Sequence, residues 1–169
     1  MIYFDQHSGW CSPVVYIPYH SYKEVDDHNP HLEGPDIRNG REVFNRICSL
    51  CHGMDGSGKP GQAPPLAGSE WVNAAGVERL ARIPILGLSG PIDVHGEQYE
   101  FASGMTAVAA TREMMSDKDL ADILSYIRQA WGNKASEVTA QQVAEIRDGL
   151  GNRTGQATAK QLKELPEGK

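Results

Sequence analysis

Apolar residues recur at helical spacing in two well separated stretches of the chain. The first begins at Asp36, whose side chain can cap a helix start, and it contains Gly40, which leaves room for a close neighbour. The second begins at Ser116 with an S-x-x-D sequence and ends near Trp131. The apolar positions of the two stretches are Ile37, Phe44, Ile47, Cys48, Leu120, Ile123, Leu124 and Ile127. Both stretches are predicted to be amphipathic helices.

Between these helices the pattern predicts a series of shorter elements. A short helical turn capped by Ser69 precedes a helix over residues 76–88, which Pro84 is expected to kink or shorten. Residues 92–101 alternate in polarity around a turn at His95, which predicts a small hairpin with this histidine facing solvent. The middle of the chain is therefore expected to hold the only β-structure.

The end of the chain carries two further helix-start signals. Thr139 and Thr158 each begin a T-x-x-Q sequence followed by apolar residues at helical spacing. The second of these short helices is expected to stop at Pro166. Residues 133–169 thus form a predicted helical extension, which either caps the domain or docks a partner.

Composition limits the size of the core and the class of partner. With 169 residues and 40% hydrophobic content, the chain can hold one compact domain with flanking segments. Its formal net charge of −6 argues against a nucleic-acid partner and, if charge steers docking, favours a protein with a basic patch. No stretch approaches the roughly 18 to 20 apolar residues that span a bilayer. We therefore expect no transmembrane segment.

The strongest chemical signal is the CxxCH sequence formed by Cys48, Cys51 and His52. Two thiols at this spacing can reach the two vinyl groups of a haem, while the adjacent histidine presents its imidazole to the iron. The glycine-rich residues 53–61 that follow are suited to a loop folded tightly against a flat ligand. The sequence thus predicts one covalently attached haem c.

Three other interpretations of this motif are open. A structural zinc site needs four Cys or His ligands in two clusters, but only one further cysteine, Cys11, exists. A thioredoxin-like redox pair needs a preceding strand, whereas helical periodicity precedes Cys48. A plain disulfide between Cys48 and Cys51 is the third.

Several further short sequence segments (phrases below), which occur in a fixed order, resemble the class I c-type cytochromes. The resemblance is to monohaem bacterial cytochromes that occur as subunits or fused domains beside periplasmic dehydrogenases and oxidases, and it covers roughly residues 36–131. Besides the CxxCH motif, the phrases are Ala-Pro-Pro-Leu-Ala-Gly-Ser at 63–69, Gly-Leu-Ser-Gly-Pro-Ile at 87–92, Leu-Ser-Tyr-Ile-Arg at 124–128 and Trp-Gly-Asn at 131–133. The resemblance implies an all-α cytochrome c fold around one covalently bound haem, with a small β-hairpin.

Carried over position by position, the resemblance assigns roles to individual residues. Pro64 is expected to offer its carbonyl to the second ring nitrogen of His52, which fixes the orientation of this iron ligand. Leu66 is expected to pack on the haem, and Trp71 is also expected to contact the cofactor. Three residues are expected where the first and last helices of the domain cross: Gly40, Phe44 and Tyr126.

The resemblance also implies Met105 as the sixth ligand of the iron, because it follows the hairpin where such cytochromes carry this ligand. A His52/Met105 pair raises the reduction potential, since the neutral thioether favours ferrous iron. Thr106, however, stands where the motif usually has proline, and a few extra residues precede the helix start at Ser116. The alternatives are Met114, Met115, the more remote Met54, or no protein sixth ligand.

Residues 1–35 match nothing in this pattern. Their many aromatic residues and prolines favour an extended arm that wraps the domain, docks on another subunit, or ends a preceding segment. The spacing of His7, Cys11 and His20 fits no compact metal site, so we expect these histidines to be unligated. Cys11 is expected to be a free thiol or a crosslink, since no apolar lipobox precedes it.

The expected location follows from the cofactor. Residues 1–10 lack the basic start and apolar run of a secretion signal, yet covalent haem attachment to bacterial cytochromes takes place outside the cytoplasm. We therefore expect a mature, trimmed or excised chain in the periplasm or on the extracytoplasmic face of the membrane.

These inferences divide the chain into an arm (1–35), a cytochrome c domain (36–132) and a C-terminal helical extension (133–169). The predicted function is one-electron transfer, without enzymatic activity, to or from a dehydrogenase, an oxidase or another electron-transfer subunit. The alternative is a ligand-binding or catalytic haem with an open sixth site, either a sensor or peroxidase-like. A single CxxCH motif argues against the two-haem peroxidases.

Overall fold

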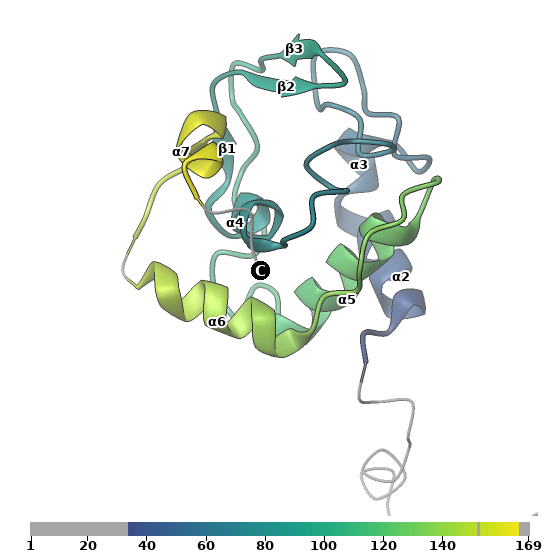
Figure 1. The fold of residues 1–169 in the computed structure, drawn as a ribbon, viewed down its shortest axis with the longest axis vertical. Helices are drawn as coiled ribbons and strands as arrows, with labels where there is room; N and C mark the ends of the chain where they lie inside the picture. The colour runs from purple at the N-terminus through teal and green to yellow at the C-terminus, as the bar shows by residue number, and fades with distance from the viewer. Residues whose placement is uncertain (1–33, 152, 166–169) are drawn as a thin grey trace, which may run out of the picture. The chain divides into compact units, whose positions relative to one another are not determined.

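The computed structural model describes residues 34–151 and 153–165, and helices predominate among them (Figure 1). The helices are α2 (Ile37–Ile47), α3 (Ser49–His52), α4 (Glu78–Leu86), α5 (Asp117–Gln129), α6 (Ala140–Leu150) and α7 (Ala159–Lys163). The strands are β1 (Leu88–Ser89), β2 (Ile92–Val94), β3 (Glu97–Tyr99) and β4 (Ala157–Thr158). The predicted helical fold with one small antiparallel hairpin is confirmed. Most of the predicted arm, including His7, Cys11 and His20, lies outside the described residues.

Helices α2 and α5 cross each other, and this crossing organises the domain. Asp36 caps α2 by accepting the backbone N–H groups of residues 38 and 39, and Ser116 caps α5, both as predicted. Gly40 lies in the contact, and the Phe44 and Tyr126 rings pack with centroids 5.6 Å apart. The predicted meeting of these residues at the helix crossing is confirmed.

Helix α4 is shorter than the predicted 76–88. It continues past Pro84 and ends at Leu86, because Gly87 takes a φ of 81° and Leu88 enters β1. The proline therefore does not set the end of the helix. Its carbonyl instead accepts hydrogen bonds from the backbone N–H groups of Val108 and Ala109, at 3.0 and 2.9 Å.

The hairpin of β2 and β3 lies within the predicted residues 92–101. His95 and Gly96 form its turn with φ values of 56° and 76°, and this pair of positive angles suits a two-residue hairpin turn. The His95 side chain is exposed, as expected.

The C-terminal extension packs on the rest of the domain. Both predicted T-x-x-Q capping boxes are present, at the starts of α6 and α7. The sequence did not predict β4, which pairs in parallel with β1 and brings α7 beside that strand (Figure 1). Val143, Ile146 and Leu162 of the extension are buried in the same apolar core as Leu120 of α5. The extension therefore covers this core.

Within the described ranges, no helix combines the length and apolar character that crossing a bilayer requires.

Candidate functional site

The end of α2 delivers the CxxCH residues. Cys48 is the last residue bonded into α2, and the turn of α3 places Cys51 and His52 so that the N–H groups of both bond the Cys48 carbonyl, at 3.2 and 2.9 Å. Cys48 is half-buried, Cys51 is exposed, and no disulfide joins them. Burial, with a contribution from Cys51, raises the pKa of the Cys48 thiol to about 11. This thiol is therefore protonated at neutral pH.

His52 is held by the predicted contact with Pro64. Its Nδ1 lies 3.1 Å from the Pro64 carbonyl oxygen, which can only accept, so Nδ1 carries the proton. Burial lowers the pKa of His52, although the bond to Pro64 opposes this shift, and the ring is neutral at pH 7. Among the described residues, nothing hydrogen-bonds Nε2, so its lone pair is available to a metal ion.

The glycine-rich loop closes tightly behind this histidine. The Gly58 N–H donates to the His52 carbonyl at 2.9 Å, and Lys59 pairs with Ala63 across the loop. Gly58 has a φ of 76°, and a Cβ there would lie 2.7 Å from the carbonyl carbon of Pro64. Only glycine allows this approach, and the approach sets the position of the Pro64 carbonyl.

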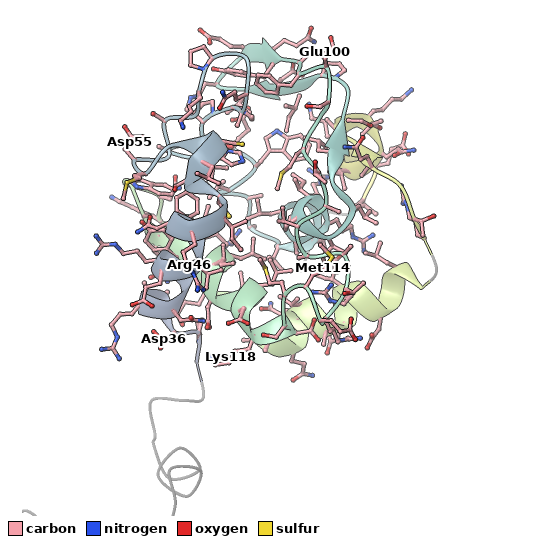
Figure 2. The ribbon with its side chains drawn as sticks, turned by 180° about the vertical axis from the view of Figure 1, so that it is seen from behind. Asp36, Arg46, Asp55, Glu100, Met114 and Lys118 are labelled. Carbon is pink, nitrogen blue, oxygen red and sulfur yellow. The ribbon has the colours of Figure 1, made fainter. Side chains whose placement is uncertain are left out.

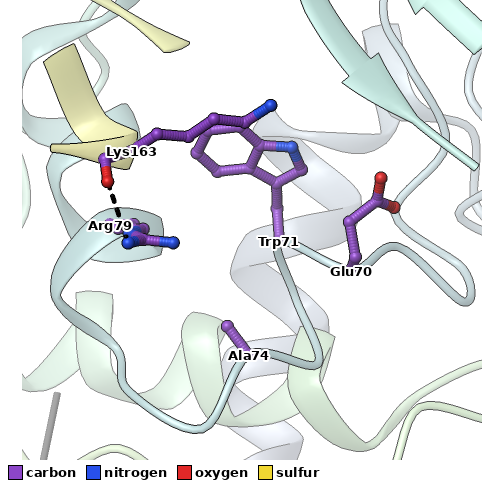
Figure 3. Close-up of a pocket in the computed structure, with 5 residues that line it drawn as sticks. All are labelled: Glu70, Trp71, Ala74, Arg79 and Lys163. Atoms are coloured by element: carbon purple, nitrogen blue, oxygen red, sulfur yellow. Dashed lines mark hydrogen bonds between the residues drawn. The ribbon is translucent and has the colours of Figure 1, made fainter. Parts of the chain in front are cut away.

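Trp71 is buried, and its indole N–H donates to the carbonyl of Asp93 in β2 at 2.9 Å, which ties this segment to the hairpin. Lys163 of α7 lies over the indole, with Nζ 5.7 Å from the ring centroid (Figure 3). A cavity of about 370 Å³ opens here, lined by Glu70, Trp71, Ala74, Arg79 and Lys163.

The methionines differ in burial. Met105 is half-buried against the core, and its backbone forms a two-way bridge with Leu88. Met54 and Met114 are 68% and 57% exposed, and Figure 2 shows Met114 on the loop that precedes α5. Met115 is only 5% exposed and belongs to the core.

The arrangement fits a covalently attached haem. Two unpaired thiols lie one turn apart, the neighbouring imidazole offers its Nε2, and Leu66 and Met105 are partly buried apolar side chains packed on the core. Within residues 34–151 and 153–165, no three His, Cys, Asp or Glu side chains are grouped to hold a metal ion. The zinc alternative therefore finds no ligand set there.

Asn133 has a structural role that was not predicted from the sequence. This residue is 4% exposed, and its amide donates to the carbonyls of Leu66 and Ile127 while its oxygen accepts from Gly68 and Asn73. It therefore ties the end of α5 to the loop that carries Leu66. Its only sequence signal was its place in the Trp-Gly-Asn phrase.

Comparison with known proteins agrees with this geometry. A family model described as Cytochrome c matches residues 37–131. Cytochrome c-552 of Thermus thermophilus is 33% identical over 97 residues, which cover 56% of this chain and 69% of that protein.

Two similar proteins are subunits of dehydrogenases. The cytochrome c subunit of alcohol dehydrogenase (quinone) from Gluconobacter oxydans (strain 621H) is 31% identical over 96 residues, 57% of this chain and 19% of that protein. The gluconate 2-dehydrogenase cytochrome c subunit of Pantoea cypripedii is 31% identical over 117 residues, 66% of this chain and 24% of that protein. The chain thus matches about a fifth to a quarter of the length of these subunits.

Proposed function

This chain belongs to the cytochrome c family, and from that premise we propose that it relays single electrons to or from a redox enzyme as a subunit or domain. The family carries haem c, covalently attached, and this cofactor supplies the one-electron chemistry. The observation that carries the proposal is the CxxCH turn at the end of α2, with Nδ1 of His52 fixed by Pro64. Nothing in this role requires the chain to act as an enzyme.

In this proposal each residue of the site has one task. Cys48 and Cys51 hold the haem through thioether bonds, and His52 presents Nε2 to the iron. Pro64 prevents the imidazole from rotating, because the ring cannot turn without losing its hydrogen bond. Leu66 packs on the haem and excludes water.

Met105 is the proposed sixth ligand. Its half-buried side chain and bridged backbone support this role, because a ligand must be held facing the iron. Met54 and Met114 are mostly exposed, and Met115 is packed in the core immediately before α5. A His52/Met105 pair gives the haem a high potential, which suits an electron carrier.

Electrons are proposed to pass through the surface around Cys51. This cysteine is exposed, and the neighbouring Leu50 and Met54 are 66% and 68% exposed, which is unusual for large apolar side chains. Arg46 adds a positive charge on the outer side of α2 (Figure 2). Asp55, beside Met54, is also exposed and adds a negative charge (Figure 2). The apolar side chains, rather than one sign of charge, therefore define the contact area that a partner would match.

The relatives support the choice of partner, and the cofactor supports the location. Two of them are named as cytochrome c subunits of dehydrogenases, so we propose a dehydrogenase or related oxidoreductase as the partner. Because bacterial haem c is attached outside the cytoplasm, we place the chain in the periplasm or on the extracytoplasmic face of the membrane.

Absorption spectra of the oxidised and reduced holoprotein test the ligand assignment. We expect the weak long-wavelength band that reports sulfur bound to ferric haem, lost in Met105→Ala and kept in Met114→Ala. The reduced protein should not bind carbon monoxide at neutral pH. A wild type without the sulfur band that takes up carbon monoxide readily would instead indicate a ligand-binding or catalytic haem.

A further inference from the structure

The main chain at Met105 is held by a strand pairing that reaches into the C-terminal extension. The N–H of Met105 donates to the Leu88 carbonyl at 2.8 Å, and the N–H of Leu88 donates back at 2.9 Å. Leu88 also pairs with Ala157 of β4, whose N–H donates to Gly87 at 3.1 Å. Three chain segments therefore lie side by side, with β1 between the Met105 segment and β4.

Gln156 adds a direct bond from the extension to the same residue. Its Nε2 donates to the Met105 carbonyl at 3.0 Å and lies 3.4 Å from the Ser103 carbonyl. The approach is close, since a Cβ at Gly104 would lie 3.2 Å from this nitrogen. The carbonyl of Met105 thus accepts from both Leu88 and Gln156.

Met105 belongs to the loop of residues 103–116, called the sixth-ligand loop below. Arg147 of α6 holds the end of this loop that precedes α5. This arginine is 8% exposed, and its guanidinium donates to the carbonyls of Ala109 and, at 3.3 Å, Met115. Its Nε donates to Asp117 at 2.8 Å, and Asp117 also binds Arg112 of the loop at 2.6 Å. A buried guanidinium that satisfies loop carbonyls gives the loop one defined path.

We propose that residues 133–151 and 153–165 are a brace for the sixth-ligand loop, with Gln156 and Arg147 as positioning residues that keep the Met105 sulfur on the iron. This inference rests on the proposed function, because it requires Met105 to be the ligand. A single thioether is easily displaced by a competing ligand when its loop can move away. Contacts that raise the cost of moving the loop therefore disfavour displacement.

Imidazole, which competes with the sulfur for the iron, is the probe. The affinity of the oxidised holoprotein for imidazole is measured by spectral titration in wild type, Gln156→Ala, Arg147→Lys and Gln142→Ala. Gln156 is exposed, so its truncation removes the bond to Met105 without opening a buried hole. Arg147→Lys keeps the charge but loses the planar guanidinium, whose three separate nitrogens reach Asp117, Ala109 and Met115. Gln142→Ala is the control, because it weakens the capping box of α6 without contacting the loop.

We expect Gln156→Ala to bind imidazole about three- to tenfold more tightly than wild type, which corresponds to the loss of one hydrogen bond. Arg147→Lys should shift the affinity in the same direction. Gln142→Ala should lower the stability but change the imidazole affinity by less than about twofold, since the loop contacts remain.

Two results would overturn the brace and leave the proposed function intact. The first is that Gln156→Ala and Arg147→Lys both bind imidazole with the same affinity as wild type while the sulfur band of Met105 is present. The other is an equal gain of affinity in Gln142→Ala, because the effect would then follow stability alone. A sulfur band that survives Met105→Ala would overturn the ligand assignment and the brace together.

Discussion

Gly40 of α2 lies against the main chain of Asp122 in α5. A Cβ at position 40 would lie only 2.5 Å from the Asp122 carbonyl carbon and 3.0 Å from the Cβ of Tyr126. Main-chain atoms inside a helix cannot move aside as a flexible side chain can. The distance between the two helices, and with it the place where α2 delivers Cys48, therefore depends on the absence of a side chain at this position.

We predict that Gly40→Ala lowers the free energy of unfolding by about 2 kcal/mol, because the forced separation of the helices outweighs the better helix propensity of alanine. Denaturant unfolding of the holoprotein measures the change. The matched control is Gly149→Ala, also within a helix but with open space around it, which should gain about 0.5 to 1 kcal/mol. Equal effects of the two substitutions would contradict this account of the crossing.

The two crossing helices could be predicted from the sequence because their signals are local, whereas their contact was implied by the resemblance to class I c-type cytochromes. Asp36 and Ser116 cap helix starts, and Gly40 and Phe44 stand one turn apart on one face. The pairing of β1 with β4 could not be predicted, since two-residue strands have no period to detect. For the same reason Leu88 was assigned to a helix, although Gly87 ends α4 just before it.

Asp122 is fully buried, and its carboxylate holds the start of α2. It accepts the backbone N–H of Asp36 at 2.8 Å, the amide of Asn39 at 2.7 Å and the ammonium of Lys118 at 2.7 Å. Asp122→Ala would remove these three hydrogen bonds from a buried position, although Asn39 would keep its bond to Asp119. We therefore predict a loss of about 3 kcal/mol in unfolding free energy.

The control for Asp122→Ala is Asp148→Ala, which removes a solvent-exposed ion pair with Arg112. Exposed pairs contribute at most about 1 kcal/mol, so this variant should stay close to wild type. Denaturant unfolding of both variants compares the two carboxylates directly. A loss at Asp122 no greater than that at Asp148 would show that the buried network is not stabilising.

Asp117 should make part of the stability depend on pH. Burial alone would raise its pKa, but hydrogen bonds from Arg112 and Arg147 outweigh this effect and hold the pKa below its usual 3.8. A lowered pKa means that the carboxylate stabilises the fold above pH 3.8 and that this contribution is lost as the pH falls through the folded-state pKa.

Unfolding of wild type and Asp117→Asn at several pH values tests this dependence. The stability advantage of wild type should be constant from pH 7 to about 5 and should shrink below about 4. Glu164→Gln controls for the change in net charge, because Glu164 is exposed and its side chain makes no hydrogen bond to a described residue. An advantage that is unchanged in acid would contradict the ionic role of Asp117.

The contacts of the sixth-ligand loop with Arg147 and Gln156 were not predictable from the sequence. An arginine and a glutamine in an amphipathic extension have the sequence signature of exposed residues. Their partners are main-chain carbonyls of Ala109, Met115 and Met105, which carry no side-chain signal at all. The CxxCH motif could be recognised because its chemistry lies in five consecutive residues, whereas these contacts join segments more than 30 residues apart.

Asn133 provides the sharpest test of how the loop carrying Leu66 is held. Its Oδ1 accepts from the Gly68 N–H at 2.8 Å, while its Nδ2 donates to the Leu66 carbonyl at 3.1 Å. Asn133→Asp keeps the acceptor for Gly68 but turns a buried carboxylate oxygen toward the carbonyls of Leu66 and Ile127. We predict that it lowers the unfolding free energy by about 3 kcal/mol.

Hydrogen exchange of the Gly68 amide separates the two halves of this contact. Asn133→Ala removes the acceptor, so the Gly68 amide should exchange faster relative to other amides of the same variant, whereas Asn133→Asp should keep it protected relative to its neighbours. The control Gln62→Glu also replaces an amide with a carboxylate, but on an exposed side chain without a hydrogen bond to a described residue, and should change neither quantity. Equal protection of Gly68 in wild type and Asn133→Ala would mean that this N–H does not depend on Asn133, which would leave the bonds of Leu66 and Ala67 to the Gly56 carbonyl to hold the loop.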